Sequence, residues 1–252
     1  MNHRYGWIRD LPDGRDHRFR HYIRGLYSTP LPSAVDLRPQ CPPVYDQGDL
    51  GSCTANAIAG ALEFDAIRQS LPVITPSRLF IYYNERVIEG TVSSDSGAQI
   101  RDGIKSVAAQ GDCPETEWPY DPSQFAVQPS PACYADAVKH VAVIYEAVDQ
   151  NLDSLRGCLA AGFPFVYGFT VYQSFESSTV EETGVVPMPG WLFDQPVGGH
   201  AVLAVGYDDA AQTFTVRNSW GPAWGDAGYF HFPYAYMSGR LASDFWTIRT
   251  IQ

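Results

Sequence analysis

The spacing of apolar residues divides the chain into a helical part and a strand-forming part. After Cys53, apolar residues recur at intervals of three and four positions, which predicts a helix over 53–69. Similar patterns predict helices over 77–87, 98–109 and 152–161, and Gln110-Gly111 ends the helix over 98–109. The residues of the first stripe are Ala55, Ile58, Ala59, Leu62 and Ala66.

Beyond residue 160 the apolar runs become short, β-branched and aromatic, and clusters of Gly, Pro and Asp separate them. Such runs are typical of strands. Helices followed by strands predict an α+β fold with two segregated lobes, and a cleft between such lobes is the default place for chemistry. The runs are PFVYGFTVY (164–172), HAVLAVGYDD (200–209), TFTVRNSW (213–220), GYFHFPY (228–234) and DFWTIRT (244–250).

Composition and charge exclude several classes of protein. The 252 residues, 45% of them hydrophobic, are enough to build a packed core. A net charge of −11 argues against a nucleic-acid partner, because phosphate binding needs clustered Lys and Arg. No apolar run approaches the ~18 residues of a membrane span. The N-terminal sequence lacks the apolar core of a secretory signal, which leaves the location open between the cytoplasm and export by a non-classical route.

The N-terminal region, residues 1–30, is predicted to be an irregular or weakly helical arm. Residues 1–27 hold six Arg and three Asp, a charge of +3, which leaves −14 for the rest of the chain. A basic arm can dock on an acidic body, although a solvated terminus would carry the same charges. Its apolar residues would anchor a docked arm; they are Tyr5, Trp7, Ile8, Leu11, Phe19 and Tyr22.

The cysteine pattern indicates no metal site and no cofactor. There is no CxxC and no Cys/His pair at ligand spacing. The number of cysteines is odd, so one can be a working thiol while the other four are free or paired. Without a secretory signal we expect mostly reduced thiols. The five residues are Cys41, Cys53, Cys113, Cys133 and Cys158.

Cys53 is the candidate nucleophile because it begins a predicted helix, whose N-terminus lowers the pKa of a thiol. Among the six histidines only His200 opens an apolar strand directly after two glycines, and an amide follows at Asn218. Such a trio can form a nucleophile, its base and the group that orients the base. Each signal is weak alone, since cysteines are commonly buried hydrophobes and a lone histidine before a strand is more often structural.

Taken together, three segments resemble the signature blocks of the papain-like cysteine peptidases, in the family's order. The segments are DQGDLGSCTANAIAGALEF, GHAVLAVGY and RNSWGPAWGDAGYF. The resemblance extends from LPSAVDLRP to DFWTIRT and includes DSGAQIRDGIKSVAAQGDCPETEWPYD, which is similar to the family's substrate-binding loop. The variants CPPVYDQG and YGWIRDLPDGRDHR resemble the bacterial branch. The resemblance implies a peptidase domain over 31–252, with a helical lobe over about 45–130 and a β-barrel-like lobe over about 131–252 plus 31–44.

The resemblance also implies a role for each matching residue. Cys53 is the expected nucleophile, His200 its base, and Asn218 the residue that orients the imidazole. Gln47 and the Cys53 backbone N–H are the expected oxyanion donors. The expected substrate-binding residues are Gly97, Gly168, Gly198, Gly199, Trp220, Trp224 and Asp244. Trp220 would cover the Asn218–His200 contact, and Trp224 would line the leaving-group side.

Two positions depart from the family pattern beside the nucleophile. Leu50 stands where many members have a cysteine that braces this loop by a disulfide, and Thr54 stands in place of a tryptophan. We expect local repacking and no loss of activity. Gly168, Gly198 and Gly199 suggest a roomy pocket for the second substrate residue. Asp244 would lie near its floor and favour a basic side chain, although an Asp that caps the last strand is an equal reading.

The resemblance implies a monomeric cysteine endopeptidase that acts on peptides or proteins through a thiolate–imidazolium pair and a thioester acyl-enzyme. Two alternatives stay open: a peptide ligase or acyl-transferase with the same residues, and a non-catalytic peptide-binding member of the fold. The family's long helical propeptide motif is absent from residues 1–30, and about 30 residues are too few to rebuild it. We therefore expect the arm to lie across or beside the cleft and to limit substrate access.

Overall fold

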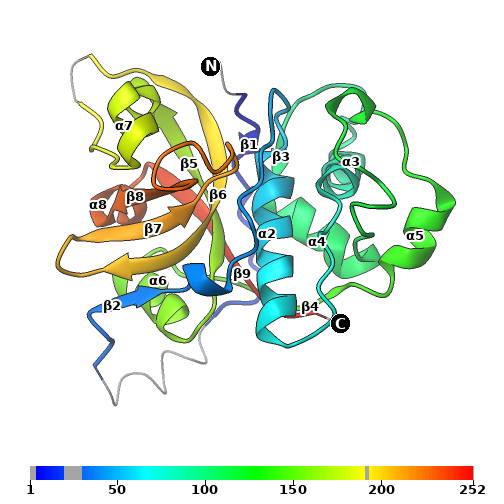
Figure 1. Cartoon of the computed structure of the whole chain (residues 1–252), viewed down its shortest axis with the longest axis horizontal. Helices are drawn as coiled ribbons and strands as arrows, with labels where there is room; N and C mark the ends of the chain where they lie inside the picture. Colours follow the sequence, from blue (N-terminus) through cyan, green and yellow to red (C-terminus); the bar gives the residue numbers. More distant parts are fainter. Residues whose placement is uncertain (1–3, 20–29, 191–192, 252) are drawn as a thin grey trace.

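The computed structural model describes residues 4–19, 30–190 and 193–251. The helices within residues 78–137 lie on one side, the antiparallel sheet and the short helices after residue 150 lie on the other, and α2 (Cys53–Arg68) lies between them (Figure 1). The α+β fold with two lobes that the sequence predicts is confirmed. Among the described residues, no helix has the length and apolar character needed to cross a bilayer.

The helical lobe is built around α2, which is buried on nearly every side from Cys53 to Ala66. Because α2 lies between the lobes, most of its residues are small or apolar, and Gly60 lets the Arg217 side chain approach closely. Ser77 caps α3 (Arg78–Glu89) by accepting a hydrogen bond from the Phe80 N–H at 3.1 Å, and Gly90 ends it in the left-handed conformation. α4 (Ile100–Gln110) ends at Gly111, as predicted.

The β lobe is a seven-stranded sheet of antiparallel pairs in the order β4-β9-β5-β6-β7-β8, with β2 paired to β6. The long strand β6 therefore has β2, β5 and β7 as partners, and α2 packs against it. The strands are β2 (Ala34–Asp36), β4 (Ala142–Ala147), β5 (Phe165–Tyr172), β6 (Pro196–Asp208), β7 (Thr213–Arg217), β8 (Tyr229–Pro233) and β9 (Ala242–Ile251).

Several elements lie outside the predicted pattern. They are the helices α5 (Pro131–Ala137), α7 (Ser178–Thr183) and α8 (Tyr234–Ser238) and the strand β4, whereas the predicted helix over 152–161 is present as α6 (Leu152–Ala160). α5, which the sequence-based boundary at 130 places with the strands, packs instead on α3 through Cys133, Ala137 and Phe80.

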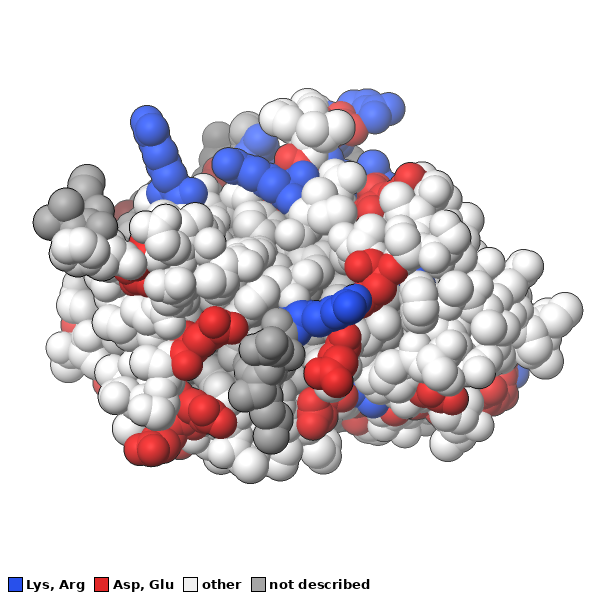
Figure 2. Space-filling view, turned by 90° about the horizontal axis from the view of Figure 1, so that it is seen from above, with Lys and Arg blue, Asp and Glu red and all other residues white. Residues whose placement is uncertain are grey.

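The expectation of an irregular or weakly helical arm is wrong at Trp7–Ile8, which form the strand β1. β1 pairs in parallel with β3 (Ala98–Gln99), just before α4. The arm also docks on the body through charge: Arg4 pairs with Asp95 at 2.6 Å and Arg18 with Asp149 at 2.9 Å. On the face where the N-terminus lies, acidic side chains gather on both sides of a central basic one (Figure 2).

The apolar residues of the arm divide into anchors and exposed side chains. Phe19 is buried, and Tyr5 and Trp7 are half-buried against the core. Ile8 and Leu11 were predicted to anchor the arm, but both are exposed, Leu11 to 73%. Tyr22 lies outside the described residues.

Candidate active site

Cys53 is the first residue of α2, and its side chain is fully buried. The free N–H groups and the dipole at this helix end favour a thiolate. Burial nevertheless raises the pKa of the Cys53 thiol to about 12, while the nearby backbone N–H groups of Ala201, Gly6 and Thr54 lower it. Since Ala201 follows His200 on β6, the sulfur lies beside the strand that carries the histidine, as the sequence predicts.

His200 lies on β6 and Asn218 directly after β7, which is the neighbouring strand. The His200 Nε2 and the Asn218 Oδ1 are 2.8 Å apart, and the same oxygen accepts a hydrogen bond from the Ser219 N–H at 2.9 Å. The bond to Nε2 leaves Nδ1 as the ring nitrogen that is not engaged by the amide. The expected histidine–asparagine pair is therefore formed.

Trp220 covers this pair. Its ring stacks on the imidazole of His200, with centroids 4.9 Å apart and planes 23° apart. Trp224 meets Trp220 edge to face at 5.1 Å and also contacts Phe175. Both tryptophans are nearly buried, so together they shield the His200–Asn218 bond from water. Trp224 thus supports Trp220 within a packed aromatic cluster.

The amide of Gln47 is oriented by three contacts. Its Oε1 accepts a hydrogen bond from the Ser219 hydroxyl at 2.6 Å, which turns its Nε2 toward the nucleophile loop. That Nε2 donates to the Leu50 carbonyl at 2.9 Å and to the Arg4 carbonyl of the arm at 3.2 Å. Sequence reasoning missed Ser219, although its place between Asn218 and Trp220 was a usable signal.

The arm crosses the site at Gly6. The Gly6 carbonyl accepts a hydrogen bond from the Ala98 N–H at 2.7 Å. A Cβ on Gly6 would lie 1.7 Å from the Gly51 carbonyl oxygen, and one on Gly97 would lie 2.0 Å from the Gly6 carbonyl oxygen. Gly97, with φ of +74°, thus lets the arm come close, as expected for a residue that presents backbone to a peptide.

Trp7 fills a pocket of the β lobe. A Cβ on Gly168 would lie 2.0 Å from the Trp7 ring, and one on Gly199 would lie 2.7 Å from it. The Trp7 indole N–H donates to an oxygen of Asp244 at 3.0 Å. Gly168 and Gly199 thus leave room for the Trp7 ring, and Asp244 lies at the end that receives the indole nitrogen.

Gly198 belongs to a different contact. A Cβ there would lie 2.6 Å from the ring of Tyr5, which is 6.1 Å from the His200 ring and 6.2 Å from the Trp220 ring. The Tyr5 hydroxyl donates to Glu176, a residue that sequence reasoning did not single out. The arm therefore contacts both glycines that precede His200, Gly198 through Tyr5 and Gly199 through Trp7.

Thr54 and Leu50, the unusual neighbours of Cys53, are both buried. The Thr54 hydroxyl donates to Glu85 Oε1 at 2.6 Å. Burial between α2 and α4 raises the pKa of Glu85 well above its usual range, which favours the neutral form of this carboxyl. The expected repacking at Thr54 is therefore a hydrogen bond to a buried acid. No disulfide links the five cysteines, all of which lie in described segments.

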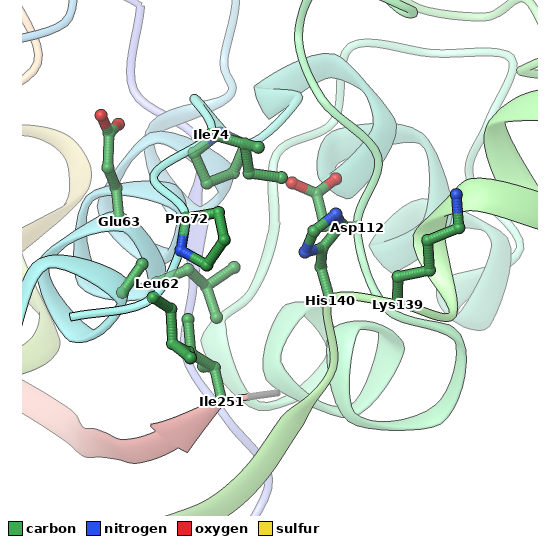
Figure 3. Close-up of a pocket in the computed structure, with 11 residues that line it drawn as sticks. Leu62, Glu63, Pro72, Ile74, Asp112, Lys139, His140 and Ile251 are labelled. Carbon is green, nitrogen blue, oxygen red and sulfur yellow. The ribbon is translucent and has the colours of Figure 1, made fainter. Parts of the chain in front are cut away.

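A second cavity lies away from this site, between α2 and residues 71–76, and has a volume of about 220 Å³ (Figure 3). Its lining is mainly apolar, with Asp112 and His140 on one side. None of the expected site residues lines it. Within residues 4–19, 30–190 and 193–251, no group of His, Cys, Asp and Glu is arranged to hold a metal ion.

Known proteins are similar to this chain over most of its length. A family model described as papain family cysteine protease matches residues 31–243. An uncharacterized peptidase C1-like protein, L477 of Acanthamoeba polyphaga mimivirus, is 42% identical and covers 100% of this chain and 88% of its own length. Cathepsin B-like CP3 of Giardia intestinalis is 30% identical, over 82% of this chain and 71% of that protein.

Among solved structures, xylellain, a cysteine protease from Xylella fastidiosa, is similar with a TM-score of 0.90 and 47% identity. The alignment covers 98% of this chain and 96% of xylellain. It supports the resemblance to the bacterial branch. The chain therefore belongs to the papain family of cysteine proteases.

Proposed function

We propose that this cysteine peptidase is an endopeptidase whose N-terminal arm occupies its own active site. In the proposed reaction, His200 takes the proton of Cys53, and the thiolate attacks the carbonyl carbon of a substrate peptide bond. His200 then gives the proton to the leaving amine, and water releases the acyl group from the thioester. The 2.8 Å bond between His200 and Asn218 supports this proposal, because it fixes the ring through the nitrogen that does not take the thiol proton.

Gln47 and the Cys53 backbone N–H would stabilise the oxyanion of that step. The carbonyl oxygen of Arg4 already rests on the Gln47 amide at 3.2 Å, which is how a substrate oxygen would use this donor. Removing one such donor in a hydrolase lowers turnover by about 100- to 1,000-fold.

The arm is proposed to block the site as a ligand that is not cleaved in this pose. Near the Cys53 sulfur the arm presents the N–H of Gly6, which is a hydrogen-bond donor and no target for a nucleophile. Burial of Cys53 raises the pKa of its thiol, so displacement of the arm would also bring the thiol closer to its reactive form. The single observation that carries the block is the hydrogen bond between Gly6 and Ala98, at the strand edge that a substrate peptide would need.

The carboxyl groups of Asp10 and Asp244 give this block a pH dependence. The Asp10 N–H donates to Asp244 at 2.8 Å, and the Asp10 carboxylate accepts from the Trp246 indole at 2.9 Å. Burial and the nearby Asp244 raise the pKa of Asp10 to about 7, although Arg101 lowers it. Because the pKa of Asp10 is raised in the docked arm, protonation of Asp10 stabilises docking. This stabilisation is fully present below about pH 4 and is lost as the pH rises through about 7.

We therefore predict that Cys53 of the full chain becomes more accessible between pH 5 and pH 7.5. The rate at which a small thiol reagent labels Cys53 is measured relative to a Gly6→Val variant, whose arm cannot seat. With Asp10→Asn, this ratio of labelling rates should change little with pH. The matched control is Asp13→Asn, at a partly exposed carboxylate of the same arm that pairs with Arg15. A ratio that falls with rising pH would contradict the assignment.

The pocket that holds Trp7 is proposed to receive the second substrate residue, with Asp244 favouring a basic side chain. In the Gly6→Val background, Asp244→Asn should lower the kcat/KM ratio of Arg to Phe at that substrate position by about tenfold, as one lost charge-assisted contact predicts. The two peptides differ only there, so fold effects cancel in the ratio. If the ratio did not change, Asp244 would have no role in substrate selection and would serve only to hold the arm.

A further inference from the structure

The carboxylate of Asp95 joins the nucleophile loop to the helical lobe. Its oxygens accept hydrogen bonds from the Gly51 N–H at 3.0 and 3.2 Å and from the Tyr82 hydroxyl at 2.5 Å. The Asp95 side chain is only 10% exposed. In the docked arm, Arg4 adds an ion pair to the outer oxygen at 2.6 Å.

Gly51 occupies a decisive place in the loop. The carbonyl of Leu50, directly before it, accepts a hydrogen bond from the Gln47 amide at 2.9 Å. Ser52 and Cys53 follow it, so the Gly51 N–H lies between the two proposed oxyanion donors. A shift of Gly51 would therefore move both the Gln47 amide and the Cys53 N–H.

Tyr82 extends the connection to the substrate-binding edge. Its hydroxyl donates to Asp95 and accepts a hydrogen bond from the Gly97 N–H at 3.2 Å. Burial and the hydrogen bond to Asp95 both raise the pKa of Tyr82, so the hydroxyl stays protonated and remains a donor. One carboxylate thus ties the nucleophile loop to the glycine that lies against the arm.

We propose that Asp95 is a positioning residue that holds the oxyanion donors of Gln47 and Cys53 in place through Gly51. Its hydrogen bonds brace the nucleophile loop in place of a disulfide, which cannot form here because Leu50 has no sulfur and the described cysteines are unlinked. The proposal rests on the proposed peptidase mechanism, and its test is arranged so that the two can fail separately.

The experiment uses the full chain with Gly6→Val, which keeps the arm out of the site. Asp95→Ala removes both bracing bonds and leaves the Gly51 N–H without its acceptor. Asp95→Asn keeps Oδ1, which accepts from Gly51 at 3.0 Å and from Tyr82, and loses only the contacts of the outer oxygen, which are the longer one to Gly51 at 3.2 Å and the pair with Arg4. The matched control is Asp49→Asn, an exposed carboxylate two residues before Gly51.

Three readouts separate positioning from general damage. They are kcat and KM on a peptide substrate, the rate of Cys53 alkylation by iodoacetamide, and amide hydrogen exchange over residues 47–53. Alkylation needs the thiolate and no oxyanion donor, so a loss of oxyanion geometry lowers turnover and leaves alkylation intact.

Asp95→Ala is expected to lower kcat by about 10- to 100-fold, with KM and alkylation within threefold and faster exchange in the loop. Asp95→Asn should keep at least a third of the turnover, and Asp49→Asn all of it. Equal kcat in Gly6→Val and Gly6→Val/Asp95→Ala would overturn the proposal, as would parallel losses of turnover and alkylation. If Gly6→Val itself had no turnover, the peptidase mechanism would fail, and unchanged exchange in Asp95→Ala would then overturn the brace independently.

Discussion

Replacement of Gly6 with valine is expected to raise kcat/KM of the full chain by about 10- to 1,000-fold. The Cβ atom would lie 1.7 Å from the Gly51 carbonyl oxygen, so the docked pose becomes sterically impossible. If the open form is about 0.1–10% populated in the wild type, complete opening raises the active fraction by about 10- to 1,000-fold. Initial rates on a fluorogenic peptide measure the change.

Gly14→Ala provides the matched control, because a Cβ at Gly14 has no neighbour within 4 Å although Gly14 belongs to the same arm. This variant should hydrolyse the peptide at the wild-type rate. If Gly6→Val and Gly14→Ala gave the same rate, the arm would be a structural strap without effect on access.

Loss of the imidazole should have the opposite effect. In the Gly6→Val background, His200→Ala is expected to lower kcat by about 100- to 10,000-fold, because the proton of the thiol and that of the leaving amine lose their carrier. His200 is fully buried, so thermal unfolding is measured alongside to separate lost chemistry from a lost fold. A folded His200→Ala variant that kept a tenth of the turnover would contradict the assigned base.

The catalytic residues could be predicted because their chemistry requires particular residue types, and because the segments that hold them resemble the family's signature blocks in order. Cys53 begins a helix that apolar spacing predicts, and His200 opens the apolar run of β6, whose first residues include the two glycines. Their proximity, however, depends on the packing of α2 against β6 and could be inferred only by resemblance. The contact between Ser219 and Gln47 spans 172 positions and leaves no local pattern in the sequence.

The elements that were not predicted, β4 and α5, show where local sequence patterns are insufficient. β4 is short and partly exposed, and it obtains its hydrogen bonds from β9, more than a hundred residues later. α5 is different, since Ser130 caps it and Pro131 occupies its first position, a start signal that the sequence does contain. For α5 the information was present, whereas for β4 it lies in the tertiary structure.

The pose of the arm could be predicted only in outline. Charge and aromatic residues favour docking, yet Tyr5 and Trp7 are anchors while Leu11 is exposed. The difference depends on where the Gly6 carbonyl meets the Ala98 N–H, because that contact directs Trp7 toward Gly168 and Tyr5 toward Gly198. A contact between backbone groups 92 positions apart leaves no mark on residue types beyond the glycine itself.

The most direct test of a Cys53 nucleophile covered by the arm is the rate of labelling by an epoxysuccinyl inhibitor at neutral pH, followed by intact mass. We expect slow labelling of the wild-type chain, rapid addition of one inhibitor per chain at Cys53 in Gly6→Val, and none in Gly6→Val/His200→Ala. Equal labelling rates in wild type and Gly6→Val, or attachment at another cysteine, would contradict it.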